Sequence, residues 1–391
     1  MQRRKGFTAL GIVLVAINMR LPITAIPPIL PNLQQASGLS ATVAGLLTSI
    51  PLLTFAIFSS VFTKASQRWG EFKVLLIAFI ILSCGAALRI FPQVTPLLLG
   101  TFLIGLGIDG GNVIIPAVIK DRLPDRPTLG VSLYTTAMVL MSSLATGIVG
   151  PLTAKFSLTT TMVALFVLSL VSVVGCLLLI DRHPADTVKP TNATAKLPKS
   201  IWTDQLAWLI TLFFGIQALL YYSLVTWLPN IFQTVGYDAT VAAMLVTILQ
   251  LACLACALLT PIFASSKLGK RLMLWIIGIG FSLGTIGVYL PLHTLAFGVT
   301  LALLMGVASG FSFNLAIIFF TQKTSNPSET IEVSGMAQTF GYLFAAAGPF
   351  SFGLLKSWSG SWLSTLLSCL VLAIAILVTG FLIERHTNVF Q

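Results

Sequence analysis

Long apolar stretches, separated by short clusters of charge, proline and glycine, run along the whole chain. Residues 21–63 and 272–322 contain no acidic or basic side chain, and six shorter uncharged stretches lie between and after them. A membrane-spanning helix needs about 20 apolar residues, so each of the two longest stretches holds two helices or nearly so. With loops placed at proline, glycine and charge clusters, the pattern predicts twelve helices, at residues 6–30, 41–63, 72–90, 95–120, 128–152, 157–180, 204–229, 239–264, 271–290, 294–321, 331–355 and 360–384.

Composition supports the same interpretation. Hydrophobic residues make up 56% of the 391 residues and charged residues 8%, whereas an ordinary soluble protein carries about 25% charged residues. A soluble domain needs charge on its surface, and a disordered chain is polar, so both classes are excluded. The sequence therefore predicts an all-α polytopic membrane protein. We expect no cleaved leader, because the first apolar run is too long and no small-residue cleavage site follows it.

The basic residues predict the orientation in the membrane. With twelve helices both termini lie on one side, and most of the 22 lysines and arginines fall in the loops of that side. Only Arg89, Lys155 and Lys356 fall on the other side, and Arg20 lies inside the first helix. Because positive loops stay in the cytoplasm, we expect both termini there, in the cytoplasmic membrane. Membrane topology accounts for the net charge of +11, so nucleic acid is not an expected partner.

The chain also repeats itself at an offset of about 198 residues. Residues 30–32 and 228–230 both read Leu-Pro-Asn, residues 41–44 and 239–242 both read Ala-Thr-Val-Ala, and residues 150–151 and 348–349 both read Gly-Pro. Several matches in one register indicate duplication. We therefore expect a six-helix bundle at residues 1–180, a polar linker at 181–203 and a second six-helix bundle at 204–391.

Two duplicated bundles are typical of a secondary transporter that works by alternating access, with its substrate held between the halves near the bilayer midplane. Short motifs narrow the class. They are Asn18-Met19-Arg20-Leu21-Pro22, Ala44-Gly45-Leu46-Leu47-Thr48, Gly111-Asn112-Val113-Ile114-Ile115-Pro116, Tyr221-Tyr222, Trp227-Leu228-Pro229, Ser334-Gly335-Met336-Ala337-Gln338 and Gly341-Tyr342. In these residues the chain resembles the major facilitator superfamily and, within it, the cyanate and nitroimidazole permease family.

The resemblance covers essentially the whole chain, and it implies a fold and a cargo. The fold is twelve helices in two pseudo-repeat bundles, with helices 1, 4, 7 and 10 lining the cavity. The cargo is a small polar or anionic solute such as cyanate or a nitroimidazole. We expect a monomer that contacts the lipid bilayer, binds this small molecule and is coupled to protons. The superfamily's loop signature, in which Asp precedes Arg, is altered here, because Gln67 and Ser266 stand at those places.

Arg20 is the leading candidate for substrate binding. Placing a guanidinium deep in a spanning helix costs at least about 2.5–3.5 kcal/mol on insertion scales, so Arg20 needs an anionic partner. Its planar fork suits an anionic or strongly dipolar substrate. Pro22 removes the amide that would bond the Asn18 carbonyl, which loosens the helix at this point. The alternative is a structural ion pair that locks helices 1 and 4.

Asp109 is the other charged residue in the middle of a predicted helix. If helices 1 and 4 line one cavity, Asp109 faces Arg20. A lone carboxylate in a low dielectric can carry a proton, whereas one beside an arginine stays ionised. Asp109 is therefore either a coupling residue, competing with substrate for Arg20, or half of a structural pair. Relatives commonly have a small apolar residue at this place.

Uncharged polar side chains complete the candidate site. Gln217 and Tyr221, four residues apart, share a helix face, as do Asp109 and Asn112, three apart. The repeat puts Ala218 where Arg20 lies, so the two halves are chemically unequal. For each candidate the alternative is a hydrogen bond to a neighbouring helix. The candidates are Asn18, Asn112, Gln217, Tyr221, Tyr222, Gln250, Asn314, Gln338 and Tyr342.

Two residues are candidates for the outer mouth. Arg89 lies near the outer end of the third helix, and the resemblance supports a basic residue there. The alternative is that its stem simply snorkels to the membrane surface. Trp227 lies near the outer end of the seventh helix, where a tryptophan also serves as an interface anchor.

Other classes of function find no support. The pattern Gly105-x-Gly107-x-x-Gly110 matches a dinucleotide fingerprint, but no strand precedes it. The cysteines and histidines form no metal set or catalytic triad, so we expect no cofactor, no metal and no enzyme. We predict a proton-coupled secondary transporter of a small anionic or polar solute. The alternatives are a proton-coupled exporter of cationic drugs, a receptor or channel, and, least of all, an intramembrane enzyme.

Overall fold

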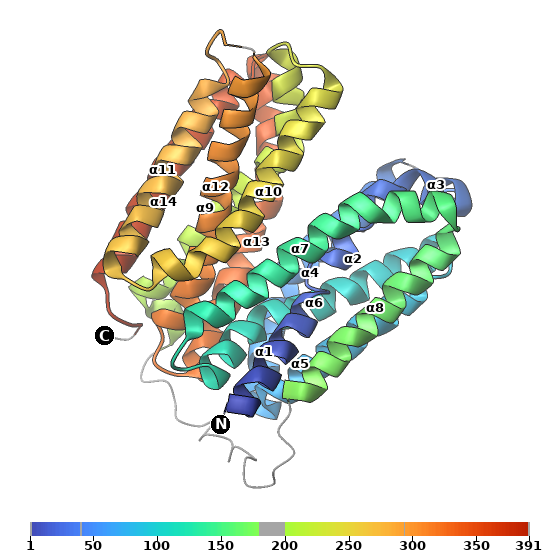
Figure 1. Ribbon diagram of the computed structural model, residues 1–391, viewed down its shortest axis with the longest axis vertical. Coiled ribbons are helices and arrows are strands. Elements are labelled where there is room, and N and C mark those ends of the chain that lie inside the picture. Colours follow the sequence, from blue (N-terminus) through green and yellow to red (C-terminus); the bar gives the residue numbers. More distant parts are fainter. Residues whose placement is uncertain (1, 40, 180–199, 293, 390–391) are drawn as a thin grey trace. The chain divides into compact units, whose positions relative to one another are not determined.

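Figure 1 shows the computed structural model, which describes residues 2–39, 41–179, 200–292 and 294–389. These residues form helices and connecting turns, and no strand occurs among them. Eleven of these helices, α4 to α14, match the second to the twelfth predicted helix in order. The elements are α1 (Gln2–Ala16), α2 (Leu21–Thr24), η1 (Pro27–Ile29), α3 (Leu30–Ser37), α4 (Ala41–Trp69), α5 (Glu71–Leu88), α6 (Val94–Arg122), α7 (Pro127–Lys155), α8 (Leu158–Leu179), η3 (Ile201–Thr203), α9 (Gln205–Thr234), α10 (Ala239–Ala264), α11 (Lys267–Gly287), α12 (Leu295–Gln322), α13 (Pro327–Ser359) and α14 (Leu363–Arg385).

The apolar composition of the helices marks a multi-pass membrane protein. Within the described residues, nine helices have both the length and the hydropathy needed to cross a bilayer, namely α5 to α12 and α14. Their outward faces carry large apolar side chains such as Val167, Ile262 and Val371, each more than half exposed. A soluble protein would bury such residues, whereas lipid solvates them.

The first predicted helix is not continuous. We expected one helix over residues 6–30, but α1 ends at Ala16, a turn covers residues 17–20, and the short elements α2, η1 and α3 follow. Pro22, Pro27 and Pro28 explain the interruption, because each lacks the amide hydrogen that an α-helix needs and its ring clashes with the preceding turn. The motif that contains Arg20 therefore lies at a break between two helices.

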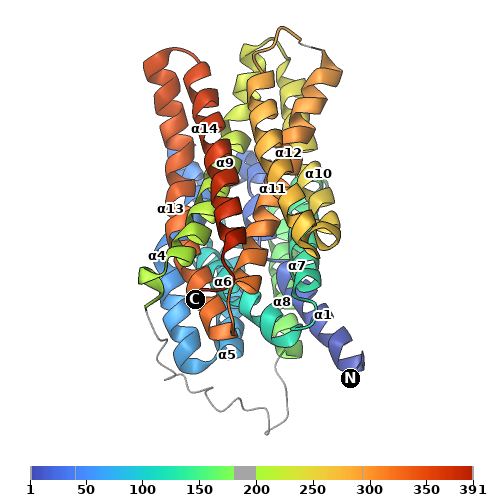
Figure 2. The same cartoon turned by 90° about the vertical axis from the view of Figure 1, so that its left-hand side faces the viewer.

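The contacts divide the chain into two compact units. Unit 1 comprises residues 1–203 and 324–339, and unit 2 comprises residues 204–323 and 340–389. The same helix pairs recur six helices apart. In unit 1, α4 and α5 pack on α6, and α8 packs on α1 and α5; in unit 2, α10 and α11 pack on α12, and α14 packs on α9 and α11. Figure 2 shows α9, α11, α12 and α14 side by side. The duplication predicted from sequence thus reappears as duplicated packing.

One segment departs from a simple division into halves. Residues 324–339, which belong to the second repeat by sequence, pack in unit 1. Lys120 Nζ donates to the Thr324 carbonyl at 2.5 Å, and Ser334 Oγ donates to the Val113 carbonyl at 2.6 Å. Gln67 Nε2 donates to Glu332 Oε1 at 2.6 Å. A cavity of about 400 Å³ lies beside these contacts, between residues 60–67, 200–202 and 332–336.

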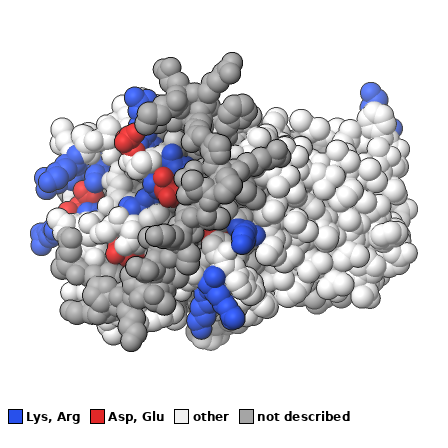
Figure 3. Space-filling view, turned by 90° about the horizontal axis from the view of Figure 1, so that it is seen from below, with Lys and Arg blue, Asp and Glu red and all other residues white. Residues whose placement is uncertain are grey.

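On the face that Figure 3 views, most charged side chains gather over one part, and a large part carries few charges. In unit 2, Lys270 Nζ lies 3.2 Å from Glu384 Oε1, and Lys323 Nζ lies 3.8 Å from the same oxygen. Burial lowers the pKa of Lys323, and the Glu384 carboxylate counters this by raising it. Lys323 Nζ also donates to the His386 carbonyl at 2.6 Å. The end of α12 is thereby tied to the residues that follow α14. Most of the predicted polar linker, residues 181–199, lies outside the described residues.

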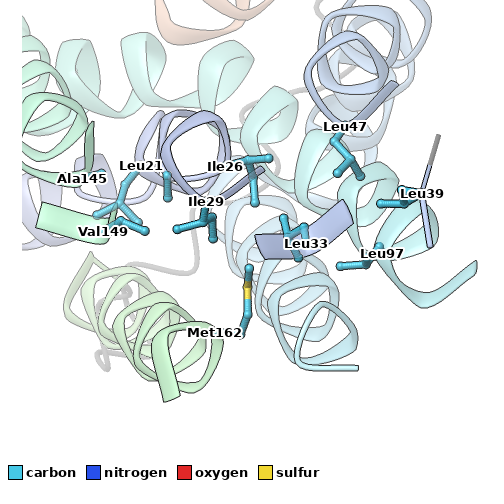
Figure 4. Close-up of a cluster of buried hydrophobic side chains, with 11 residues drawn as sticks. Leu21, Ile26, Ile29, Leu33, Leu39, Leu47, Leu97, Ala145, Val149 and Met162 are labelled. Carbon is cyan, nitrogen blue, oxygen red and sulfur yellow. The ribbon is translucent and has the colours of Figure 1, made fainter. Parts of the chain in front are cut away.

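An apolar cluster holds the short elements that follow the helix break. Leu21, Ile26, Ile29 and Leu33 are almost fully buried and contribute to it from one side. Figure 4 shows that they meet side chains from α4, α6, α7 and α8, namely Leu47, Leu97, Ala145, Val149 and Met162. Because a buried leucine or isoleucine contributes about 1.5–3 kcal/mol, this packing anchors a segment with little helical hydrogen bonding of its own.

Candidate functional site

Arg20 is the last residue of the turn between α1 and α2. It has φ −133° and ψ −29° and forms the N-cap of α2, and its carbonyl accepts from the amides of Ile23 and Thr24 at 3.0 and 3.1 Å. Its side chain is half-buried. A helix break directs a side chain away from the regular helical face and leaves backbone groups available for ligands. The structure therefore presents the leading sequence candidate at an irregular point of unit 1.

Tyr134 on α7 connects to Asn112 on α6. The Tyr134 hydroxyl donates to Asn112 Oδ1 at 3.2 Å, and the phenol lies within electrostatic range of the Arg20 charge. The sequence analysis missed Tyr134. The available signal was a phenol inside an uncharged predicted helix.

Asn18 lies in the same turn as Arg20 but faces another neighbour. Its amide donates to the Leu168 carbonyl at 2.9 Å and to Ser172 Oγ at 2.7 Å, both on α8. The side chain has no exposed surface. Ser172 Oγ in turn donates to the Leu14 carbonyl at 2.8 Å, so its single proton is used there and its lone pairs accept from Asn18. These contacts give Asn18 the helix-joining role that was the alternative to substrate binding.

Asp109 has a different environment from the one expected. Its Oδ1 lies 2.5 Å from Ser59 Oγ on α4, and the side chain has no exposed surface. Within the described residues no ion pair joins Asp109 to Arg20, and Oδ2 has no hydrogen-bond partner. Although Asp109 and Asn112 are three residues apart, they bond side chains of different helices. The spacing predicted a shared face, but each neighbouring helix reaches only part of that face.

Arg89 does not snorkel to a surface. It follows the last residue of α5 and is only 3% exposed. Its Nη1 donates to the Pro22 carbonyl at 2.7 Å, and its Nε and Nη2 donate to Thr101 Oγ1 at 3.1 and 2.8 Å. Both interpretations of Arg89 at the outer mouth assumed an accessible side chain. The structure instead buries it against the helix break.

The candidates of unit 2 are uncharged. Tyr221 and Tyr222 are half-buried, with ring centroids 5.3 Å apart, and Gln217 is buried on the same helix, α9. Asn314 is buried and donates to the Gly310 carbonyl of its own helix at 2.8 Å. Gln250 on α10 is half-buried. Unit 2 thus offers amide and phenol groups where unit 1 offers a guanidinium.

The remaining candidates lie on or against α13. Tyr342 packs edge-on against Phe214, with centroids 5.6 Å apart. Trp227 Nε1 donates to the Pro349 carbonyl at 2.8 Å, and its ring lies 5.2 Å from that of Trp362. Gln338, which belongs to unit 1, is buried, and its Oε1 has no hydrogen-bond partner within the described part of the chain. Trp227 therefore joins α9 to α13, and the buried oxygen of Gln338 is left for another ligand.

No set of metal ligands occurs in the described ranges: no three residues among His, Cys, Asp and Glu lie close enough to hold an ion. The candidate side chains can bind a ligand through hydrogen bonds and through charge. In unit 1, the half-buried guanidinium of Arg20 lies within electrostatic range of the Tyr134 phenol, which bonds Asn112, and the Asp109 carboxyl group is buried three residues before Asn112 on α6. Such a group can bind a small anionic or dipolar molecule.

Comparison with known proteins relates this arrangement to a family. Residues 8–349 match the family model of the Major Facilitator Superfamily. The chain is 32% identical over 383 residues to an uncharacterized transporter of Bacillus subtilis, YycB, an alignment that covers 97% of this chain and 94% of that protein. It is 30% identical to the 2-nitroimidazole transporter of Escherichia coli, over 97% of this chain and 95% of that one.

Two further comparisons extend the match. The cyanate transport protein CynX of Escherichia coli is 28% identical over 90% of this chain and 91% of its own length. The fold is similar to that of the fucose:proton symporter FucP of Escherichia coli, with a TM-score of 0.77, 14% identity, and coverage of 97% of this chain and 98% of that one. At that identity the likeness concerns the fold, and it agrees with the predicted twelve-helix arrangement.

Proposed function

Since the chain belongs to the Major Facilitator Superfamily and is a transporter, not an enzyme, we propose that it moves a small anionic or polar solute by alternating access. Two of the relatives compared above are named for 2-nitroimidazole and for cyanate, which are both small and polar. Cyanate is an anion, and a nitroimidazole is strongly dipolar. A guanidinium recognises both kinds of charge distribution through its planar fork of donors.

Arg20 is the observation that carries this proposal. A half-buried arginine at a helix break inside a spanning segment is expensive to insert, and such residues mark substrate or ion pathways. The hydrogen-bonded pair of Tyr134 and Asn112 lies within electrostatic range of Arg20 and can orient a small ligand. We infer that Arg20 supplies most of the affinity for the anion. The Tyr134 phenol and the Asn112 amide orient the bound molecule.

The polar side chains of unit 2 stay proposed substrate contacts, as the sequence predicts. Gln217, Tyr221 and Tyr222 on α9, with Gln250 and Asn314, carry neutral donors and acceptors. Because none of them carries a charge, we expect discrimination between anions and cations to depend on Arg20. Gln338 and Tyr342 are proposed on the same ground.

Uptake by purified protein in proteoliposomes tests the proposal. We expect saturable uptake of labelled cyanate or 2-nitroimidazole, and in Arg20→Ala a rise in KM of at least about thirtyfold, since removing one partner of a buried charge pair costs about 2–5 kcal/mol. Arg68→Ala is the matched control, because Arg68 is exposed at the end of α4. If the wild-type protein takes up neither probe but exports cationic dyes, the cation exporter replaces this proposal.

Asp109 is the proposed proton carrier. The Ser59 hydroxyl oxygen lies 2.5 Å from Asp109 Oδ1 and also 2.5 Å from the Phe55 carbonyl oxygen. Ser59 Oγ has one proton to share between these two acceptors, and within the described residues Asp109 Oδ2 has no hydrogen-bond partner. An acidic residue buried inside a spanning helix commonly belongs to a proton pathway, and we infer that Asp109 exchanges protons during transport. A fold shared with a proton symporter supports the same coupling.

The variant Asp109→Asn tests coupling separately from binding. Asparagine keeps the shape and a donor toward Ser59, so the protein should remain folded and still exchange labelled for unlabelled substrate across the membrane. Accumulation driven by an imposed pH gradient should be lost, because an amide cannot release a proton. Unchanged pH-driven accumulation in Asp109→Asn would remove Asp109 from coupling and leave the structural role with Ser59.

We further propose that both termini lie in the cytoplasm and that the protein works as a monomer in the cytoplasmic membrane. The excess of lysine and arginine in the loops that the sequence predicts on the side of both termini supports this orientation. A fluorescent protein fused after Gln391 should fold and fluoresce, and alkaline phosphatase fused there should be inactive. The opposite pair of results would reverse the orientation.

A further inference from the structure

The buried guanidinium of Arg89 is bound to the broken helix that carries Arg20. Among its contacts, the bond from Nη1 to the Pro22 carbonyl, at 2.7 Å, is the shortest. The other two go to Thr101 Oγ1, whose own proton is donated to the Leu97 carbonyl at 2.6 Å. Thr101 can therefore only accept from Arg89, and this fixes the plane of the guanidinium.

The break explains why the Pro22 carbonyl needs such a donor. In a continuous helix this carbonyl would accept from the amide of Ile26, four residues on. Here the Ile26 amide bonds the Ile23 carbonyl at 3.3 Å instead, because Pro27 and Pro28 end the helical pattern after α2. A buried carbonyl without a partner costs about 1–3 kcal/mol. Arg89 satisfies it with a charged donor.

The fold also makes room for this side chain. Gly85 and Gly100 let α5 and α6 approach closely, since a Cβ placed on Gly85 would lie 2.6 Å from the Gly100 carbonyl oxygen. A Cβ on Gly100 would lie 3.0 Å from Arg89 Cγ. The stem of Arg89 therefore occupies space that only a glycine leaves open, and the buried charge belongs to a built arrangement.

Other contacts hold the same segment from different sides. Asn18 joins the turn to α8, and Thr24 Oγ1 lies 3.5 Å from the Ser142 carbonyl of α7. Leu21, next to Arg20, is buried in the apolar cluster of Figure 4. Of these contacts, the one from Arg89 is the only charged hydrogen bond that the described residues make to α2, and it falls two residues from Arg20.

We propose that Arg89 is a positioning residue for substrate binding: by holding the Pro22 carbonyl it fixes α2 and thus the direction in which the Arg20 side chain leaves the backbone. Arg89 touches no substrate. This inference rests on the proposed function for its effect on affinity, whereas its effect on the placement of residue 20 is independent of what the protein transports. The two effects give two tests.

The first test is a double-mutant cycle on uptake of cyanate and 2-nitroimidazole in proteoliposomes. Arg89→Met keeps an apolar stem and removes every donor, so KM should rise about tenfold with little change in maximal rate. Arg89→Lys, which can reach one acceptor but not both, should recover part of the loss. In the Arg20→Ala background, Arg89→Met should change KM less than about twofold. An equal effect in both backgrounds, or none in the wild type, overturns the proposal.

The second test measures the placement of residue 20 directly. In a chain whose five native cysteines are replaced, Arg20→Cys is reacted with a water-soluble methanethiosulfonate, with Arg89 present or replaced by Met. The labelling rate should change at least about threefold when Arg89 is lost. Arg68→Met is the control and should leave the rate unchanged. An unchanged rate in Arg89→Met overturns the positioning role, even if neither probe is transported and the proposed function fails.

A milder variant covers the case in which Arg89→Met does not fold. Thr101→Val removes the hydroxyl that orients the guanidinium and leaves Arg89 in place. We expect a smaller rise in KM, about threefold, and a smaller change in labelling of position 20. If Thr101→Val leaves both the KM and the labelling rate unchanged, the orientation of Arg89 has no bearing on Arg20 and the proposal is wrong.

Discussion

The first helix of unit 1 and the first helix of unit 2 occupy equivalent places in the duplicated packing, yet they differ in continuity. The first is interrupted at residues 17–20 and again after Thr24, while α9 runs unbroken from Gln205 to Thr234. Both contain the shared proline of the Leu-Pro-Asn repeat, and α9 continues through it. The interruption therefore comes from the prolines that the two helices do not share.

The offset of 198 residues shows which residues the second repeat has at the positions of the break. Pro22 corresponds to Leu220 and Arg20 to Ala218, and Asn18 corresponds to Ile216. The broken helix thus carries charge, amide and proline where the continuous one carries apolar residues. A helix break supplies the irregular backbone and the polar partners that a buried guanidinium needs. In this protein the charge proposed to bind substrate lies in the broken helix.

The largest expected effect comes from moving the charge to the continuous helix. Ala218 is 2% exposed within α9, so Ala218→Arg places a guanidinium in a packed helix without a break to accommodate it. We expect a loss of at least about 2.5–3.5 kcal/mol in folding or insertion. Thermal unfolding of the purified protein in detergent measures this, with Ala218→Ser as the control. A variant that melts like the wild type would show that a break is not required for the charge.

Exchanging the residue types of the equivalent positions 18 and 216 should have a moderate effect on stability. Asn18→Ile removes two hydrogen bonds to α8 and should destabilise the protein by about 1 kcal/mol. The reverse change, Ile216→Asn, buries an amide in a helix that has no partner built for it and should cost about 2 kcal/mol. Melting temperatures of the two variants give the comparison. Equal losses would mean that the two environments are not chemically distinct.

Restoring a backbone amide should have the smallest effect. Pro22→Ala supplies a donor for the Asn18 carbonyl and favours a continuous helix through the turn, which turns Arg20 away from its present direction. We expect the KM for cyanate or 2-nitroimidazole to rise roughly fivefold, on the order of 1 kcal/mol. Pro229→Ala is the matched control, because α9 already continues through that proline. The comparison fails if the two variants change KM equally.

The site shows where helical periodicity stops being informative. Spacing placed Asp109 and Asn112 on one face of α6, and the family resemblance set Asp109 opposite Arg20, yet Asp109 bonds Ser59 and Asn112 bonds Tyr134. A helix face spans enough angle to meet more than one neighbour. The period of the sequence therefore identifies which side chains point inward, and it does not identify the helix that each one meets.

The burial of Arg89 also could not be predicted from its local sequence. Its place near the end of a predicted helix is compatible with a snorkelling side chain, and its depth follows from contacts with residues 22 and 101, far away in the chain. Residues 324–339 are a further case, because their sequence belongs to the second repeat and their hydrogen bonds belong to unit 1.

The sequence by itself determined the class, the number of helices and the duplication, because lipid imposes a minimum apolar length and a backbone without water must bond internally. It also identified Arg20, since a charge in an apolar stretch is costly wherever the helix packs. Only the tertiary structure decided where Arg89 and Asp109 are buried and how the broken segment is held. Those outcomes depend on contacts between distant residues, and no local pattern encodes them.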